Sequence, residues 1–141
     1  MNWERICLVA CHVGTMERLL EQATEFVKTR QSFGKPLSKY QAVSHRLADM
    51  KVRLEAARLV TYRAASRLGT ARDIALDASI TKLFVSEALV KTAMDTIQLL
   101  GGYGFMVEYG VERVMRDAMG GTIYSGTSEL QRNNIARWLG L

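Results

Sequence analysis

Apolar side chains recur at steps of three and four along the first thirty residues, which is the spacing of one face of an α-helix. The pattern predicts a single amphipathic helix from Asn2 to Arg30, with Asn2 as its N-cap and Glu4 in the positively polarised first turn. We expect the helix to end before Ser32–Pro36, because glycine favours a turn and proline cannot continue the hydrogen-bond ladder. The apolar positions are Trp3, Ile6, Val9, Val13, Met16, Leu19, Leu20, Ala23 and Val27.

Two further periodic stretches follow, each bounded by residues that start or stop helices. The first opens with Ser38-Lys39-Tyr40-Gln41, which has the Ser-x-x-Gln form of a capping box, and it stops at Gly69. Its core-facing positions are Tyr40, Val43, Leu47, Met50, Leu54, Ala57 and Ala65. The second begins at the candidate N-cap Asp73 and ends at Gly101-Gly102. Its apolar positions are Leu76, Ile80, Leu83, Ala88 and Ile97.

Glycine is frequent in the remaining part of the chain. The Gly101–Gly110 segment contains four glycines and several aromatic residues, which predicts an ordered loop whose backbone closely approaches another group. Val111–Met119 predicts a short helix, and Ser128–Gln131 has the capping-box pattern again, before a final helix that ends near Trp138. Three helices of about 30 residues and a shorter fourth predict an all-α, antiparallel four-helix bundle in a single domain.

Composition narrows the function classes. The chain has 141 residues, of which 48% are hydrophobic and 23% charged, and its single proline argues against the many turns of a β-sandwich or barrel. The net charge of +5 comes from basic residues scattered among acidic ones, which excludes a nucleic-acid surface but leaves room for a small phosphate-bearing ligand. The longest apolar run, Ile6–Cys11, is far shorter than the ~18 residues of a membrane span, so no membrane span is predicted.

Cysteine and histidine offer little chemistry. Cys7 and Cys11 are four residues apart on one predicted helix, so a disulfide between them would constrain the chain very little. We therefore expect both to be buried free thiols of a protein in a reducing compartment. This compartment would be the cytoplasm or, in a eukaryote, an organellar matrix. Neither His12 nor His45 follows a glutamate by three positions, so no di-iron site and no metal is predicted, and both are expected to be ordinary surface or core residues. No serine lies in the Gly-x-Ser-x-Gly pattern of a hydrolase.

Two glycine-bearing segments lie at predicted helix ends, where backbone amides and hydroxyls are available to an anion or a carbonyl oxygen. They are Gln98–Gly102 and Ser125–Glu129. Combined with the turn Arg30–Lys35, they make the chain resemble the acyl-CoA dehydrogenase family over essentially its whole length. The other matching segments are Glu4-Arg5, Gln41, Leu47-Ala48-Asp49-Met50, Gly102–Gly104, Arg116-Asp117-Ala118 and Tyr124–Gln131.

The resemblance implies a fold, a cofactor and partners. The last domain of the family is a four-helix bundle, so residues 1–141 would form this C-terminal domain, with the family's N-terminal helical and middle β domains absent from the chain. FAD is the implied cofactor, a homotetramer or homodimer the implied assembly, and an electron-transfer flavoprotein or a similar protein the implied electron acceptor. The implied cofactor-binding residues are Arg30, Gln31 and Ser32 for the pyrophosphate of an adjacent subunit's FAD, Gln41, then Gln98, Leu99, Leu100, Gly101 and Gly102 along the adenosine half, and Thr127, Ser128 and Glu129.

The resemblance also implies a reaction, in which a glutamate abstracts the α-proton of an acyl thioester while the β-hydrogen leaves as a hydride to flavin N5. Many family members carry this glutamate immediately before Gly-Thr, where this chain has Ser125, and a serine without an adjacent base cannot replace it. The isovaleryl- and long-chain-like branches instead use a glutamate at the start of the bundle, in an Asp-x-Glu-Arg pattern that resembles Asn2–Arg5. Glu4 is therefore the implied catalytic base, and the implied substrate-binding residues are Asn2, Trp3, Arg5, Ser125 and Gly126.

If Glu4 replaces a base at position 125, both residues should border one cavity within about 10 Å, since both must reach the same α-carbon. Two alternatives stay open. Loss of the usual base at Ser125 favours a non-catalytic oligomerisation module, and a dehydrogenase could also act on an acyl or aminoacyl group tethered to a carrier protein instead of coenzyme A. The 141 residues alone are expected to bind FAD weakly and to be inactive, because a half-built pocket cannot exclude water.

Overall fold

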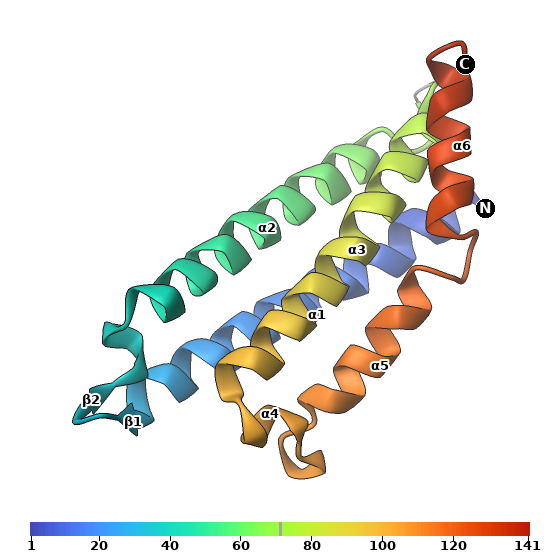
Figure 1. Ribbon diagram of the computed structural model, residues 1–141. Helices are drawn as coiled ribbons and strands as arrows, with labels where there is room; N and C mark the ends of the chain where they lie inside the picture. The colour runs from blue at the N-terminus through green and yellow to red at the C-terminus, as the bar shows by residue number, and fades with distance from the viewer. Residues whose placement is uncertain (71) are drawn as a thin grey trace.

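A computed structural model describes residues 1–70 and 72–141 and shows a bundle of long helices (Figure 1). The helices are α1 (Asn2–Thr29), α2 (Gln41–Ser66), α3 (Ile74–Leu100), α4 (Gly102–Phe105), α5 (Val111–Gly121) and α6 (Ser128–Trp138), with the 3₁₀ turns η1 (Leu37–Lys39) and η2 (Val107–Tyr109). The only strands in these described ranges, β1 (Gln31–Ser32) and β2 (Lys35–Pro36), form a small antiparallel hairpin. The predicted all-α fold is confirmed.

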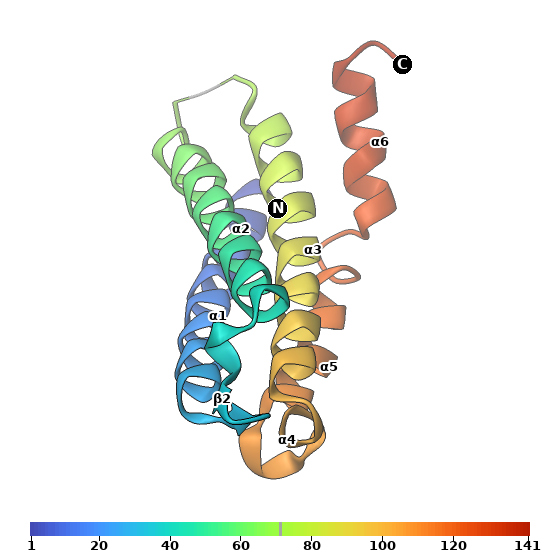
Figure 2. The same ribbon diagram turned by 60° about the vertical axis from the view of Figure 1, so that its left-hand side comes forward.

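Successive helices run in opposite directions, so that α1, α2, α3 and α5 form the predicted antiparallel bundle (Figure 1). Helix α6 continues beyond α5 and packs along the N-terminal half of α3, where Asn134 Nδ2 donates to Ser79 Oγ at 3.4 Å and Arg132 pairs with Glu87 at 2.6 Å (Figure 2). Both chain termini therefore lie at one end of the bundle, and the β1–β2 hairpin and α4 lie at the other (Figure 1).

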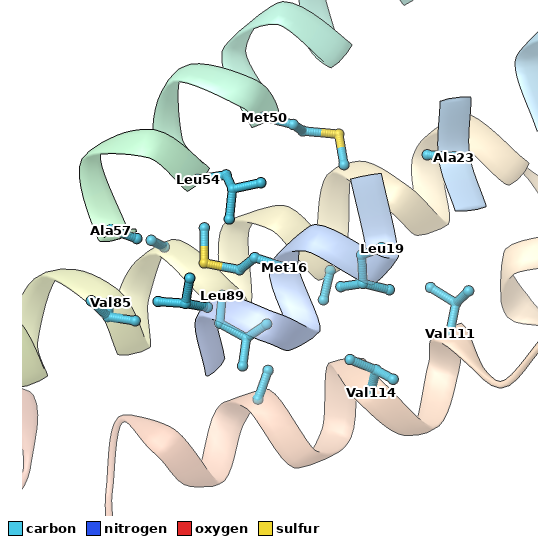
Figure 3. Packing of buried hydrophobic residues seen from close by; sticks show 14 of the residues in the cluster. Met16, Leu19, Ala23, Met50, Leu54, Ala57, Val85, Leu89, Val111 and Val114 are labelled. Atoms are coloured by element: carbon cyan, nitrogen blue, oxygen red, sulfur yellow. The ribbon is translucent and has the colours of Figure 1, made fainter. Parts of the chain in front are cut away.

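The main core lies between α1, α2, α3 and α5, where apolar side chains from all four helices meet (Figure 3). A second, smaller cluster joins α1, α2 and α3 near the chain termini. The main cluster includes Met16 and Leu19 of α1, Met50 and Leu54 of α2, Val85 and Leu89 of α3, and Val111 and Val114 of α5. The smaller cluster consists of Ile6, Ala64 and Ala78.

Helix α3 is central and is buried on almost every side because α1, α2, α5 and α6 all pack against it. The single apolar face predicted for it is therefore only partly right: Ile80 is exposed, while several polar residues are buried. Asp95 is the most strongly paired of these, accepting hydrogen bonds from Arg46 and Arg53, both at 3.1 Å, and from Lys91 at 3.0 Å. Pairing of this kind offsets much of the cost of burying a charge.

The predicted side-chain caps are wrong at the first two helix starts, although the helices begin near the expected positions. Asn2 is the first residue of α1, where Met1 occupies the N-cap without a side-chain hydrogen bond. Ser38 lies in η1 instead of capping α2, which begins only after the extended residue Tyr40. Asp73 does precede α3 as predicted, but its carboxylate pairs with Arg67 and caps nothing.

The cap of α6 differs from the prediction by one residue. Thr127, not Ser128, occupies the N-cap, and its Oγ1 accepts from Leu130 N at 3.3 Å. A Thr-Ser pair offers two adjacent registers for the same capping chemistry, so the pattern alone could not choose between them.

Three further expectations are corrected. Cys7 and Cys11 are exposed, because they lie on a face of α1 that the other helices leave uncovered. Trp3 and Ala65 are likewise exposed. The Gly101–Gly110 segment forms α4 and η2 instead of a loop. Its close backbone approach is nevertheless present, since a Cβ on Gly104 would lie 2.8 Å from Ile97 Cα.

Candidate functional site

The N-terminal turn of α1 meets the segment that leads into α6. Ser125 Oγ donates a hydrogen bond to Glu4 Oε1 at 2.7 Å, although the two residues are 121 positions apart. The expectation that these residues are close neighbours is confirmed. A cavity of about 440 Å³ at this end is lined by Arg5 instead of Glu4 or Ser125, so the shared cavity stays unconfirmed. Of the other predicted substrate residues, Asn2 is half-buried and Trp3 is exposed.

The backbone at Ser125 and Gly126 is held in an unusual conformation. Ser125 has φ 54°, in the left-handed region that costs a non-glycine residue energy, and Gly126 has φ 96°. Buried Arg5 donates from Nε to Ser125 O at 3.0 Å, and buried Gln131 donates from Nε2 to Gly126 O at 3.0 Å. The φ of Gly126 would strain any other residue, and a Cβ there would lie 2.7 Å from Gln131 Nε2, so that the anchoring amide would have to move.

Gln131 is therefore a loop anchor that the sequence analysis missed as a site residue. Its side chain reaches back along the chain from the first turn of α6 to the Ser125–Gly126 segment. The sequence placed it in the Ser128–Gln131 capping-box pattern and at the end of the matching segment Tyr124–Gln131, and neither pattern indicated that its side chain binds the preceding turn.

The first turn of α6 supplies the other predicted residues at this end. Thr127 caps the helix, and Ser128 is buried with no partner for its hydroxyl among the described residues. Hydrogen bonds from the residue's own backbone N–H, and then from the Thr127 hydroxyl, lower the pKa of Glu129. The free amides of this helix start therefore lie directly after the Ser125–Gly126 turn.

At the opposite end of the bundle, a cavity of about 440 Å³ opens between α1, α2 and α3. The structure here brings together Arg30, at the end of α1, with the glycine-ended stretch that closes α3. The Arg30 guanidinium lies 5.4 Å from the Tyr103 ring centroid, within the range of a cation–π contact. The predicted residues that line this cavity are Arg30, Gln98, Leu99, Leu100, Gly101 and Gly102.

Three predicted cofactor residues lie near this cavity without lining it. Gln31 and Ser32 form β1, directly after Arg30, and Gln41 begins α2 next to the lining residue Ala42. Phe33 at the hairpin tip has φ 48° and is 97% exposed, a conformation and an exposure that both cost free energy. Phe33 is a candidate cofactor-contacting residue that the sequence analysis did not assign. The feature of the sequence that could have indicated it is an aromatic residue directly before the turn glycine, Gly34.

The two groups of predicted cofactor residues are far apart within one chain. Helix α1 rises about 1.5 Å per residue, so Glu4 and Arg30 lie roughly 40 Å apart at opposite ends of the bundle. One cofactor of dinucleotide size cannot reach the Arg30 cavity and the Thr127–Glu129 turn of the same chain. The geometry thus agrees with the implied role of Arg30 in the site of an adjacent subunit.

A polar pair formed by buried His12 and partly exposed Tyr124 adjoins the Ser125–Gly126 turn. His12 Nε2 lies 3.0 Å from Tyr124 Oη, in hydrogen-bond contact. Burial, and then the positive charge of Lys82, hold the pKa of His12 below its ordinary value of 6.5. Burial raises the pKa of Tyr124. Both side chains are therefore neutral near neutral pH.

We expect the free energy of unfolding to fall as the pH drops below about 6.5. In that range the unfolded chain takes up a proton on His12 that the folded chain does not accept, so the unfolded state is favoured. Urea titrations between about pH 8 and pH 5 would measure this, with the exposed His45→Gln as control. The expectation is wrong if His12→Gln and the wild type lose equal stability over that range.

The described part of the chain contains neither a candidate metal-binding cluster nor a candidate membrane-spanning helix. Residues 1–70 and 72–141 contain no group of three or more His, Cys, Asp or Glu side chains arranged to hold a metal ion. None of their helices combines the length and hydropathy that crossing a bilayer requires.

Comparisons with known proteins identify the family. A family model described as "Acyl-CoA dehydrogenase, C-terminal domain" matches residues 1–140. The chain is 45% identical over 141 residues to L-prolyl-[peptidyl-carrier protein] dehydrogenase of Pseudomonas fluorescens, covering 100% of this chain and 37% of that protein. It superposes on PigA with FAD and proline with a TM-score of 0.96 at 42% identity, covering 100% of this chain and 37% of that one.

The name of a third relative states a different substrate. Butyryl-CoA dehydrogenase from Megasphaera elsdenii superposes with a TM-score of 0.95 at 39% identity, covering 99% of this chain and 37% of that one. The chain thus spans little more than a third of the length of these relatives. From the matched residues, the shared fold and these identities, we conclude that this chain belongs to the acyl-CoA dehydrogenase family and corresponds to its C-terminal domain.

Proposed function

We propose that the chain forms the C-terminal bundle of an FAD-dependent dehydrogenase that introduces an α,β double bond into an acyl thioester. The observation that carries the proposal is the 2.7 Å hydrogen bond from Ser125 Oγ to Glu4 Oε1. It places the carboxylate of α1 directly beside position 125, where many family members carry the base. Family membership supports the reaction class, and this contact supports Glu4 as the base in a chain with serine at position 125.

Each site residue of this chain has a distinct role in the proposed reaction. Glu4 takes the α-proton on its carboxylate, and the Ser125 hydroxyl holds that carboxylate by donating to Oε1. The backbone amide of Ser125 would donate a hydrogen bond to the thioester carbonyl oxygen, a role that needs no side chain. Arg5 keeps the turn in place through Ser125 O. FAD, when bound, accepts the β-hydrogen as a hydride.

The Arg30 cavity fits part of an FAD molecule. Its guanidinium suits a pyrophosphate, which it can bind with two parallel hydrogen bonds. A Cβ added at Gly101 or Gly102 would meet nothing within 4 Å, so the backbone there is open to a flat group. Arg30 and Gln98–Gly102 would therefore hold the pyrophosphate and adenosine portion.

The separation of the two ends supports an assembly of more than one copy. Because the Arg30 cavity and the Glu4–Ser125 contact lie at opposite ends of α1, we propose that each FAD is held by the Arg30 cavity of one copy and the α6 start of another. A homodimer or homotetramer meets this requirement. An electron-transfer flavoprotein or similar carrier would then reoxidise the flavin.

Replacing Arg30 by glutamine is expected to weaken FAD binding by about 10- to 100-fold, because hydrogen bonds to a charged group contribute roughly 1.5–3 kcal/mol. Flavin retained by the purified protein, and its dissociation constant by fluorescence titration, would measure the loss. Lys28→Gln is the matched control, since Lys28 is an exposed cation at the same end of α1 that does not line the cavity. Equal FAD affinity of the Arg30 variant and the wild type would refute the assignment of this cavity.

A carrier-tethered substrate is the second candidate. Two of the relatives described above bear names that state action on a carrier-bound prolyl group or binding of proline. The butyryl-CoA dehydrogenase shares the fold at slightly lower identity. We propose the carrier-bound aminoacyl thioester as the substrate to test first, with an acyl-CoA as the alternative.

A further inference from the structure

His12 is a buried titratable residue that the proposed mechanism does not use. Its side chain is only 8% exposed, in the middle of the inward face of α1. Nδ1 has no hydrogen-bond partner among the described residues, so Nε2 is the ring's sole polar contact there. A buried polar ring with one partner is a costly choice compared with an apolar side chain of similar volume. The role of His12 therefore depends on what its one hydrogen bond, to Tyr124, holds in place.

That contact joins α1 to the turn between α5 and α6. His12 Nε2 and Tyr124 Oη are 3.0 Å apart, and their ring centroids are 6.3 Å apart at 51°, so the contact is a hydrogen bond and not a stack. The backbone of the turn also approaches the ring closely, because a Cβ on Gly121 would lie 2.8 Å from His12 Cε1. His12 therefore lies against Gly121, the last residue of α5, and against Tyr124, in the middle of the segment that joins α5 to α6.

Tyr124 directly precedes Ser125, whose left-handed conformation persists only if its surroundings hold it. After Tyr124 in the chain, Arg5 donates a hydrogen bond to Ser125 O and Gln131 donates one to Gly126 O. Directly before Ser125, the Tyr124 hydroxyl forms a hydrogen bond with His12 Nε2. Contacts before and after Ser125 therefore hold its hydroxyl within hydrogen-bond distance of the Glu4 carboxylate.

We propose that His12 is a positioning residue for the Glu4–Ser125 site, acting through the Tyr124 hydroxyl to hold residues 121–127 against α1. Since His12 and Glu4 are on the same helix, one rigid element carries both the base and the anchor of the turn that meets it. The pair is neutral, with one proton between Nε2 and Oη, so it fixes the turn without adding charge beside the carboxylate. The catalytic part of this inference rests on the proposed function, and the placement of the turn does not.

The first test is a set of kinetic cycles on the full-length, flavin-loaded protein. His12→Leu and Tyr124→Phe should each lower kcat by about 3- to 10-fold, the loss expected from one hydrogen bond, and the double variant should lose no more than either. In a Ser125→Ala background, His12→Leu should have a smaller effect than in the wild type, because the hydroxyl that it positions is gone and only the backbone amides of the turn remain to be held. His12→Gln, which keeps a polar group at similar reach, should restore most of kcat.

Two controls separate positioning from a loss of folding. His12→Leu combined with Tyr124→Phe replaces both partners of the hydrogen bond by apolar groups, so the melting temperature of this double variant should stay close to that of the wild type, whereas a merely structural role predicts a fall. His45→Leu changes an exposed histidine of α2 and should leave kcat unchanged. Losses that add in the double variants, or an unchanged kcat in His12→Leu, would overturn the inference.

An activity-independent measurement distinguishes this inference from the proposed function. Amide hydrogen exchange in residues 122–127 should be faster in His12→Leu than in the wild type, with no change in α2. If the wild type never reduces flavin but exchange responds as stated, the proposed function fails and the placement of the turn stands. If the wild type is active and exchange in residues 122–127 is unchanged, the inference itself fails.

Discussion

Glu4→Gln is expected to lower kcat of the flavin-loaded protein by at least about 10²-fold, the lower end of what a general base contributes. Glutamine keeps the size and polarity of the side chain but cannot take up the α-proton. It can still accept the hydrogen bond that Ser125 Oγ gives to Glu4 Oε1, so the turn stays in place. Flavin binding should therefore be unchanged, and the loss should appear in the rate of flavin reduction.

Two comparisons sharpen this test. Ser125→Ala removes only the hydroxyl that holds the carboxylate and should cost far less than Glu4→Gln. Glu21→Gln alters another exposed glutamate of α1, remote from the Ser125 turn, and should leave kcat near the wild-type value. Near-normal turnover in Glu4→Gln would remove Glu4 as the base and favour the reading of a non-catalytic bundle.

Leu54→Ala is expected to lower the free energy of unfolding by about 2–5 kcal/mol, because the bundle relaxes only partly around the cavity that is left. Leu54 is 1% exposed and packs between α2, α1 and α3 in the main core (Figure 3). Denaturant titration with a constant m-value would measure the change. Leu59→Ala, on the same helix at 68% exposure, should change stability by no more than about 0.5 kcal/mol. Equal effects of the two substitutions would contradict the packing described for α2.

Periodicity predicted the long helices well because α1 and α2 each bury one stripe and leave the opposite side in water. It failed on α3, whose central position buries Asp95 and other polar residues that no single-face pattern contains. Helix caps were harder still. At Tyr40 the choice of start depends on an extended backbone angle that the local sequence does not reveal.

Site residues were predictable where a motif names them and unpredictable where a distant contact selects them. Arg30 and Gln98–Gly102 belong to recognisable segments, and the fold brings them to one cavity. His12 belongs to no motif, and the capping-box pattern that contains Gln131 does not indicate its contact, because each residue meets Tyr124 or the Ser125–Gly126 turn only after the bundle has formed. The His12–Tyr124 contact spans 112 residues, and a single sequence contains no trace of such a pairing.

The central claim, that this bundle belongs to a working thioester dehydrogenase, is tested most directly by following flavin absorbance during anaerobic mixing with substrate. The flavin-loaded, full-length protein would be mixed with a prolyl thioester on its carrier protein and, separately, with butyryl-CoA. We expect one of the two to bleach the flavin, more slowly when its α-carbon carries deuterium and hardly at all in Glu4→Gln. Oxidised flavin that persists with both thioesters would contradict the account.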